Sequence, residues 1–346
     1  MGNSTFKYEV MRYVSAFILI VAIGLGMFFA TRPIAQTFDG EHSVSAFLSA
    51  PYRALKQQLV SLNQEHASNT ETTILLLGKA GPGWTAGELT DTLILASLSG
   101  ATKSADLLSI PRDLMVRTGS YQGKVNALWQ IGKQENRGKG TLEHSAYIRN
   151  VVEDITGVTI DEVIVVDVSA VEQIVNTLGG VSINVVETIV DRRYPTPGGG
   201  IETFSINPGF QVLDGATAVK YARTRHTKEG DFGRIRRQHQ VIESIVSKAR
   251  GLKLTEDFTT IISLLDALGD HIETTLSLEE IANLISLSST IPFSNVETFA
   301  LETLQARGSD DPLLMGAGFA SGLIPRAGFY DYSAIHEAVS FLLEQT

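Results

Sequence analysis

The sequence predicts an α/β fold, an α/β/α sandwich with a mixed central β-sheet flanked by helices, preceded by one N-terminal transmembrane helix. Three observations support this prediction. From residue 72 onward, short apolar runs of strand length alternate with stretches of helix length. The run at 161–168 is apolar almost throughout, as in a strand covered on both faces. Residues 13–30 form an uncharged apolar segment, about long enough to cross a hydrocarbon core as a helix.

The N-terminal segment is expected to stay attached as an anchor. Lys7 and Arg12 precede it, so the positive charge favours a cytoplasmic tail at 1–12 and places the rest of the chain outside. A cleaved signal peptide is the alternative, but Phe28 stands two residues before Ala30, where a cleavage site would need a small residue. Residues 31–70 are polar and of mixed character and are interpreted as a stalk.

The first half of the body, which begins at residue 71, shows clear boundaries. Helix 141–155 should end at Gly157, and Ser169 is the expected N-cap of the helix that ends near Gly179. Strands are predicted at 72–77, 91–99, 105–113, 161–168 and 181–186, and a further helix at 126–136.

The second half begins with a loop at 194–200 and a short helix capped by Asp214. A long helix is expected at 232–250, closed by Gly251. After residue 255 we expect one or two helices, a strand near 295–303, and a terminal helix from about Tyr332. We interpret 71–255 as the catalytic core and 256–346 as the C-terminal part of the same domain.

Composition excludes several classes of function. The chain has 28 Lys plus Arg against 38 Asp plus Glu, a formal net charge of −10. This acidic balance argues against broad, sequence-independent binding of nucleic acid. The chain has no cysteine, which excludes disulfides, thiolate catalysis and metal sites ligated by cysteine.

Against this acidic background, residues 221–240 (YARTRHTKEGDFGRIRRQHQ) gather six basic side chains. Arg223 and Arg225 stand two apart and would grip one anion if the chain is extended there. The alternative is a frayed helix end whose arginines complement the helix dipole. Arg234, Arg237 and Gln238 share one face in the first turns of the predicted helix, which is a favourable place for a phosphate.

Further charges follow the ends of predicted strands. Arg112 and Asp113 come directly after one strand, Asp91 follows a Gly-rich loop, and Lys124 precedes a helix. Singly, each is interpreted as an ordinary surface charge. As a set, cations that hold phosphates and carboxylates that hold Mg²⁺ are what phosphoryl transfer requires. Trp84 and Trp129 are expected to pack or to anchor loops.

The order of these motifs resembles the LytR-CpsA-Psr family. The resemblance spans about residues 72–250 and rests on LTDTLILASL, SIPRD, GKVNALW, DEVIVVDV, YARTR and DFGRIRRQ. It implies a membrane-anchored enzyme outside the cytoplasm that transfers a glycopolymer from an undecaprenyl-pyrophosphate carrier onto peptidoglycan. It also implies an apolar channel for the prenyl tail beside the sheet.

The resemblance also implies roles for individual residues. Asp91 would hold Mg²⁺, with Mn²⁺ as the alternative ion, but Ala80 stands where the family often has a second aspartate. From the residues themselves, Glu88 is the expected substitute ligand, with extra water as the alternative, and Asp231 is the expected base, with Asp113 second. The pyrophosphate would be bound by Arg112, Lys124, Arg223, Arg225, Arg234 and Gln238, to which the helix face adds Arg237.

Other functions remain open from the sequence. A non-catalytic protein that binds polyprenyl phosphates would need the same arginines without turnover. A pyrophosphatase acting on the same lipid would use water in place of the sugar hydroxyl. A transcriptional regulator is disfavoured, because an acidic domain outside the membrane cannot readily meet DNA.

Overall fold

The computed structural model describes most of the body of the chain. It covers residues 71–344 with gaps at 85, 225–235, 238–239, 242–243, 246, 249–270, 277–279, 281–282, 285–286, 288–290, 293–294, 307 and 318–321. Among these residues no helix is both long and apolar enough to cross a membrane. The predicted tail, anchor and stalk (1–70) and most of the predicted helix at 232–250 lie outside the described residues.

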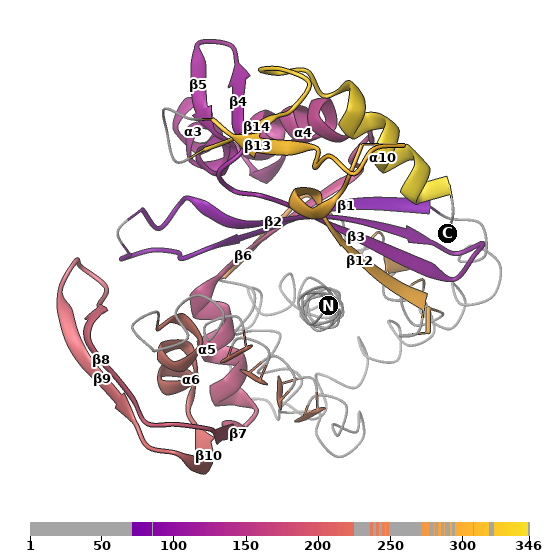
Figure 1. The fold of residues 1–346 in the computed structure, drawn as a ribbon. Helices are drawn as coiled ribbons and strands as arrows, with labels where there is room; N and C mark the ends of the chain where they lie inside the picture. The colour runs from indigo at the N-terminus through magenta and orange to yellow at the C-terminus, as the bar shows by residue number, and fades with distance from the viewer. Residues whose placement is uncertain are drawn as a thin grey trace, which may run out of the picture.

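A six-stranded mixed sheet forms the centre of the molecule, in the order β11-β6-β1-β2-β3-β12 (Figure 1). The strands β1–β2, β2–β3 and β6–β11 pair antiparallel, whereas β1–β6 and β3–β12 pair parallel. Their bounds are Glu71–Lys79 (β1), Thr90–Ser99 (β2), Ser104–Ile110 (β3), Glu162–Asp167 (β6), Ile272–Thr274 (β11) and Val296–Ala300 (β12). The predicted α/β fold with a mixed sheet is therefore confirmed.

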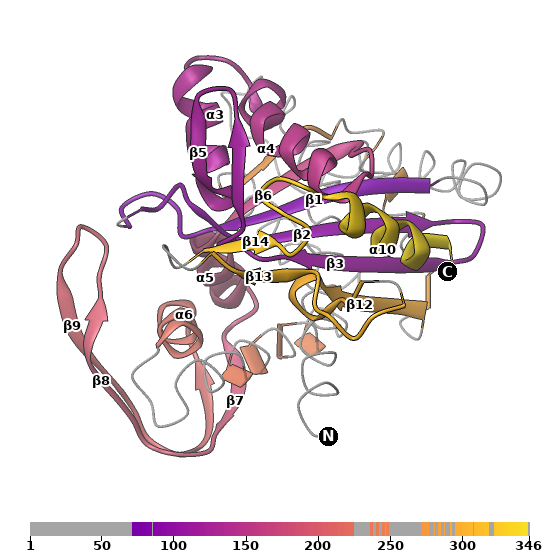
Figure 2. The same ribbon diagram turned by 45° about the horizontal axis from the view of Figure 1, so that its top comes forward.

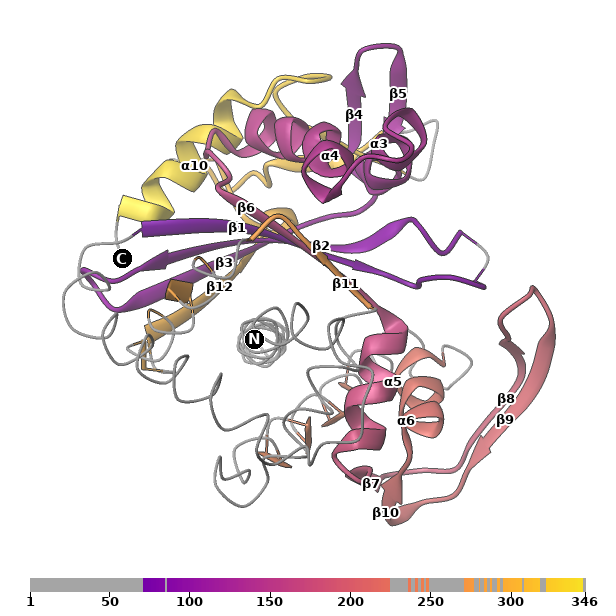
Figure 3. The ribbon, with the colours of Figure 1, turned by 180° about the vertical axis from the view of Figure 1, so that it is seen from behind.

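Two layers cover the two faces of this sheet, as Figures 1 and 3 show from opposite sides. Alternate side chains of β1 enter different cores: Leu75 and Leu77 pack toward α3, α4 and α10, and Ile74 and Leu76 toward α5 and α6. The first layer contains η1 (Val125–Ala127), α3 (Leu128–Glu135), α4 (Thr141–Thr156), η3 (Leu301–Thr303), α10 (Ser333–Glu344) and the hairpins β4 (Met115–Thr118)–β5 (Tyr121–Lys124) and β13 (Leu314–Gly316)–β14 (Leu323–Pro325).

The second layer combines two helices with two ribbons. Its elements are α5 (Val168–Thr177), α6 (Gly215–Arg223), the pair β7 (Val181–Val185)–β10 (Gly209–Leu213) and the hairpin β8 (Ile189–Pro195)–β9 (Ile201–Ile206). The β8–β9 hairpin extends from this layer as a curved arm (Figure 2). The sequence assigned 194–200 to a loop, but Tyr194 and Pro195 belong to β8, because Tyr194 is buried and packs at 6.0 Å from Phe204.

Helix ends follow the predicted caps at two of three positions. Gly157 closes α4 in the left-handed conformation (φ 73°), and the Asp214 carboxylate accepts the Thr217 backbone N–H at 2.8 Å at the start of α6. The third prediction was wrong: the N-cap of α5 is Asp167, not Ser169. Asp167 Oδ1 accepts the N–H groups of Ser169 (2.8 Å) and Ala170 (3.2 Å), which a carboxylate at the helix start does favourably.

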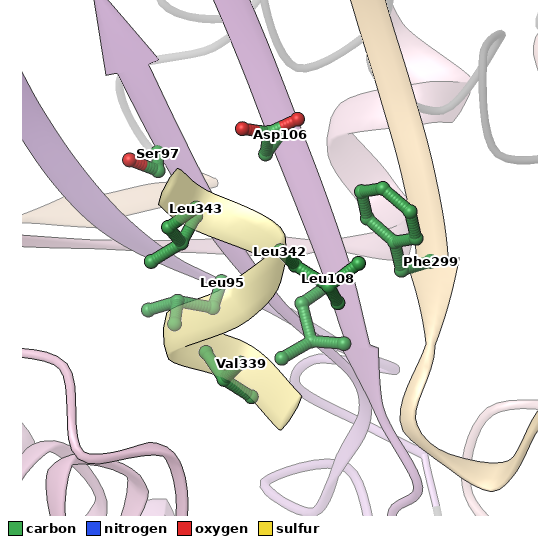
Figure 4. Close-up of a pocket in the computed structure, with 8 residues that line it drawn as sticks. All are labelled: Leu95, Ser97, Asp106, Leu108, Phe299, Val339, Leu342 and Leu343. Atoms are coloured by element: carbon green, nitrogen blue, oxygen red, sulfur yellow. The ribbon is translucent and has the colours of Figure 1, made fainter. Parts of the chain in front are cut away.

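A small apolar pocket lies between the sheet and α10 (Figure 4). Leu108, Phe299 and Val339 line it around Asp106. Asp106 pairs with Ser97, whereas Asp91 and Arg112 flank the opposite ends of the same two strands. The pocket is therefore at the far end of β2 and β3 from the charged residues described below. The predicted channel for a prenyl tail stays a prediction.

The left-handed glycine that ends α4 gives a test of the fold. Replacing Gly157 by Ala forces a Cβ into the left-handed region and to 3.1 Å from the His336 ring, so we expect the free energy of unfolding to fall by about 1–2 kcal/mol. Denaturant titration measures this. Gly316→Ala is the control, because nothing lies within 4 Å of its added Cβ and its φ is not positive. Equal stability of the two variants would contradict the assigned cap.

Candidate functional site

Three neighbouring strands bring their polar ends to one edge of the sheet. Lys79 at the end of β1 pairs with Thr90 at the start of β2, and Leu93 in β2 pairs with Ile110 at the end of β3. The Gly-rich connection between β1 and β2 and the residues that follow β3 therefore meet at this edge. Ligand sites of α/β sheets commonly form at such strand ends.

Arg112, Lys124, Asp91 and Asp113 form one cluster here, which we call the clamp cluster. Arg112 Nη1 lies 2.7 Å from Asp91 Oδ1, and Arg112 Nε lies 3.6 Å from Asp113 Oδ2. Lys124 Nζ donates to Asp113 Oδ1 at 2.6 Å. The sequence predicted these residues separately, and the structure brings them together. Lys124 reaches the cluster as the last residue of β5, in a hairpin that the sequence analysis missed.

The clamp cluster is accessible to solvent, and the guanidinium of Arg112 carries its positive charge there. The side chains of Arg112 and Asp91 are 37% and 52% exposed. Burial alone would lower the pKa of Arg112, but the negative charges of Asp91 and then Asp113 raise it above its usual value. Exposed ion pairs contribute little to stability, so an arriving anion can compete with the carboxylates for these donors. The cluster is therefore suited to bind phosphate in a bidentate manner.

Arg223 comes from the opposite layer and stacks on Trp84. It is the last residue of α6, and its Cζ lies 3.7 Å from the centroid of the indole ring. A guanidinium stacked on Trp in this way is held in orientation while its edge can still donate hydrogen bonds. The helix continues through Arg223, and Thr224 is already extended. Because Arg225 lies outside the described residues, the joint binding of one anion by Arg223 and Arg225 stays a prediction.

Trp84 is positioned by the Gly-rich loop between β1 and β2. Gly81 N–H donates to Gly87 O at 2.8 Å, and Gly87 N–H to Trp84 O at 3.0 Å. The turn of the β8–β9 hairpin adds a contact, with Gly198 N–H donating to Gly83 O at 2.6 Å. The sequence analysis gave Trp84 no part in anion binding. The signal that was available is its place in the Gly-rich loop, but its partner lies 139 positions along the chain.

Arg237 has a different environment from the one expected. It is 2% exposed, and its Nε donates to the Tyr221 carbonyl at 2.9 Å and its Nη2 to the Thr224 carbonyl. These carbonyls belong to the C-terminal end of α6, where a cation is favourable. Arg237 thus supports the segment that carries Arg223, which corrects its predicted place on a ligand-binding face. Arg225, Asp231, Arg234 and Gln238 lie outside the described residues.

Glu88, the expected substitute metal ligand, is engaged by two lysines. Its Oε2 accepts from Lys79 Nζ at 3.0 Å and lies 3.3 Å from Lys133 Nζ, and Trp129 Nε1 donates to it at 3.3 Å. Burial alone would raise the pKa of Glu88, but Lys79 and Lys133 lower it below its usual value. Glu88 therefore carries a negative charge, which the two lysines already balance.

The described residues do not fit a divalent cation. Ala80 supplies no carboxylate, Asp91 is paired with Arg112, and Glu88 is paired with lysines. Within the described part of the chain, no group of three acidic, His or Cys side chains is arranged to hold a metal ion. Mg²⁺ needs several oxygen ligands in near-octahedral geometry. Mg²⁺ or Mn²⁺ binding stays a prediction that this geometry does not support.

Comparison with known proteins identifies relatives across most of the chain. Residues 40–311 match the model of the LytR_cpsA_psr family. The polyisoprenyl-teichoic acid–peptidoglycan teichoic acid transferase TagU of Oceanobacillus iheyensis is 27% identical over 78% of this chain and 77% of its own length. The enzyme of the same name from Enterococcus faecalis is 26% identical over 83% of this chain and 87% of its own length. The crystal structure of Bacillus subtilis TagV aligns with a TM-score of 0.51 at 23% identity, covering 80% of this chain and 97% of that one, and shows a shared fold.

The assigned support role of Arg237 is testable. We expect Arg237→Leu to lower the melting temperature markedly, because two buried carbonyls lose charge-assisted hydrogen bonds worth about 1.5–3 kcal/mol each. Arg137→Leu is the control, because Arg137 is exposed in the loop after α3. Differential scanning calorimetry of both variants measures the effect. An unchanged melting temperature for Arg237→Leu would contradict the support role.

Proposed function

The chain belongs to the LytR-CpsA-Psr family, and from this premise we propose that it is a phosphotransferase that moves a glycopolymer from a polyprenyl-pyrophosphate carrier onto peptidoglycan. The names of its relatives in Oceanobacillus iheyensis and Enterococcus faecalis support the class of reaction. The observation that carries the proposal is the clamp cluster, with Arg112 and Lys124 held by carboxylates at the sheet edge. Arg223, stacked on Trp84, adds a second oriented guanidinium.

The proposed reaction breaks the phosphoanhydride bond of the pyrophosphate and forms a new phosphate ester. The hydroxyl oxygen of a wall sugar attacks the phosphorus nearer the glycan, and a new O–P bond forms. The bond from that phosphorus to the bridging oxygen breaks, and polyprenyl phosphate leaves with the electron pair. The hydroxyl proton passes to a base. The product is a phosphodiester between the glycopolymer and the wall.

The cations act on the charge that this step develops. Negative charge grows on the bridging oxygen as polyprenyl phosphate leaves, and fixed cations near it lower the barrier. We assign this role to Arg112, Arg223 and Lys124 among the described residues, and to Arg225 and Arg234 from the resemblance. Gln238, which the resemblance also places at the pyrophosphate, would add a neutral hydrogen-bond donor. The described carboxylates do not fit a metal, so no step is assigned to a bound ion.

The base is proposed to be Asp231, at the start of the predicted helix that carries Arg234. Asp113 was the second choice. Its two oxygens face Lys124 at 2.6 Å and Arg112 at 3.6 Å, so both are already engaged in ion pairs. Asp113 is better suited to orient the two cations than to accept a proton.

We also propose that the enzyme works outside the cytoplasm, anchored in the cell membrane by residues 13–30. The uncharged apolar segment and the basic residues before it support this topology. Such a location places the protein beside both a lipid-linked donor and peptidoglycan. An acidic chain in that position is not expected to bind nucleic acid.

The test of the proposed function is a transfer assay with the purified full chain. The chain is incubated with a polyprenyl-pyrophosphate-linked glycan and peptidoglycan, and we expect glycan linked to the wall through a phosphodiester together with polyprenyl phosphate. Free glycan phosphate without linked product would assign a pyrophosphatase instead. Bound lipid with no product would favour the non-catalytic binder, which the alanine at position 80 makes the second candidate.

The geometry of the clamp cluster predicts which variants bind the lipid-linked glycan more weakly. Arg112→Ala removes charge-assisted contacts worth about 1.5–3 kcal/mol. Binding of the lipid-linked glycan should weaken roughly 10- to 150-fold. The melting temperature should stay near that of the wild type, since the Arg112 side chain is 37% exposed and its ion pairs contribute little to stability. Arg223→Ala should weaken lipid binding for the same reason.

The matched control is Arg137→Ala, which removes an exposed arginine outside the clamp cluster. It should change neither lipid affinity nor melting temperature. A lower melting temperature for Arg112→Ala with unchanged lipid affinity would show that its ion pairs are structural, and the clamp would lose its proposed role.

A further inference from the structure

Two lysines and two glutamates form a closed ring of charges at the end of β1, which we call the Lys–Glu ring. Lys79 Nζ contacts Glu88 Oε2 at 3.0 Å and Glu273 Oε1 at 2.7 Å. Lys133 Nζ lies 3.3 Å from the same two oxygens. Each ammonium group therefore bridges both carboxylates, and each carboxylate bridges both ammonium groups.

Trp129 provides a platform for this ring. The Nζ atoms of Lys79 and Lys133 lie 5.8 and 5.7 Å from the centroid of the Trp129 indole. Trp129 is fully buried, so both cations lie beside an apolar aromatic side chain as well as two carboxylates. Cation–π attraction adds to the ion pairs in such an environment.

One of the four charges of the ring is buried. The Lys79 side chain is 5% exposed, whereas those of Glu88, Lys133 and Glu273 are about one-third exposed. Burial alone would lower the pKa of Lys79, but Glu273 and then Glu88 raise it above its usual value. A buried lysine with two carboxylate partners stays charged at neutral pH.

The ring lies at the same strand end as the two positions where the resemblance implies ligands of a divalent cation. Ala80, which replaces the expected carboxylate, is the residue after Lys79. Thr90, the register partner of Lys79, precedes Asp91 of the clamp cluster. Two ammonium groups and two carboxylates sum to zero charge, as a divalent cation with two carboxylates does. The ring therefore leaves no net negative charge on Glu88 and Glu273 for an ion to neutralise.

We propose that the Lys–Glu ring replaces the divalent cation of this site, so that the protein neither binds Mg²⁺ there nor needs it for transfer. The inference rests on the proposed transferase function only for its activity readout. Lys79 is a positioning residue, because it is too buried to touch a lipid and acts by neutralising Glu88 and Glu273. The bonds made and broken are those of the proposed transfer, with no additional reactant.

The test compares the full wild-type chain with Lys79→Met in MgCl₂, MnCl₂ and excess EDTA. The wild type should melt at one temperature in all three, and its transfer rate should change less than about twofold. In Lys79→Met the ring has one cation for two carboxylates. A divalent cation should then bind and raise the melting temperature by about 5 °C at roughly a hundredfold excess over its dissociation constant. Transfer by this variant should become dependent on the metal.

Two further variants separate a metal response from simple loss of stability. Lys220→Met breaks a 2.6 Å ion pair to Glu202 in another part of the fold and should show no metal response. Lys79→Met with Glu273→Gln restores neutrality with Lys133 and Glu88, and should fold and ignore Mg²⁺. This double variant serves if Lys79→Met does not fold.

A saturable rise of the wild-type melting temperature with Mg²⁺, or a wild-type transfer reaction abolished by EDTA and restored by Mg²⁺, would overturn the proposal. So would a Lys79→Met chain that folds and shows no response to either ion. If the wild type shows no transfer under any condition, the proposed function fails. The melting experiments still decide whether the ring has replaced a metal.

Discussion

The burial of Lys79 at the end of β1 is the constraint on which the arrangement of the charged residues around this strand end depends. A lysine whose side chain is only 5% exposed needs carboxylates within contact distance, because an unpaired buried charge would cost several kcal/mol. Glu88 meets this need from the connection between β1 and β2, and Glu273 from β11 at the edge of the sheet. Since Glu88 directly follows Gly87, the ion pair also fixes the end of the Gly-rich loop whose middle carries Trp84. One buried charge thus links the central strand, the edge strand, α3 and the loop that orients Arg223.

The sequence was informative wherever structure is set locally. Apolar periodicity located β1, β2, β3, β6 and α4, and the caps at Gly157 and Asp214 follow from residues next to the helix ends. The hairpins β4–β5 and β8–β9 were missed, because β8 (IVDRRYP) carries charges and a proline that resemble a loop. What turns it into a strand is pairing with β9 and burial of Tyr194, neither of which a single segment reveals.

The candidate site follows the same division. The residue types Arg112, Lys124 and Arg223 were identifiable from motifs, because their chemistry and their place after strands or helices are visible in the chain. The side chains with which these residues interact could not be identified from motifs. Arg237 looked like a ligand-facing arginine by its helical spacing, but its guanidinium is buried against the carbonyls of Tyr221 and Thr224. Glu88 was predicted as a substitute metal ligand, but two lysines from β1 and α3 occupy its carboxylate. Contacts between distant segments decide whether a charge faces a ligand, and spacing alone cannot.

A fixed lysine and a bound metal ion differ in what they can do for a reaction. A metal exchanges its ligands and can coordinate a phosphate oxygen directly, whereas Lys79 is held by two carboxylates and cannot reach a substrate. If the ring holds no metal, the charge that develops on a leaving phosphate must be met by the guanidinium and ammonium groups nearby. Those groups then have to be oriented in advance, since preorganised donors stabilise a transition state more than mobile ones. The structure supplies that orientation through Asp91 and Asp113 around Arg112, and through Trp84 beneath Arg223. In the proposed mechanism, the carboxylates of the clamp cluster therefore act by orienting these cations.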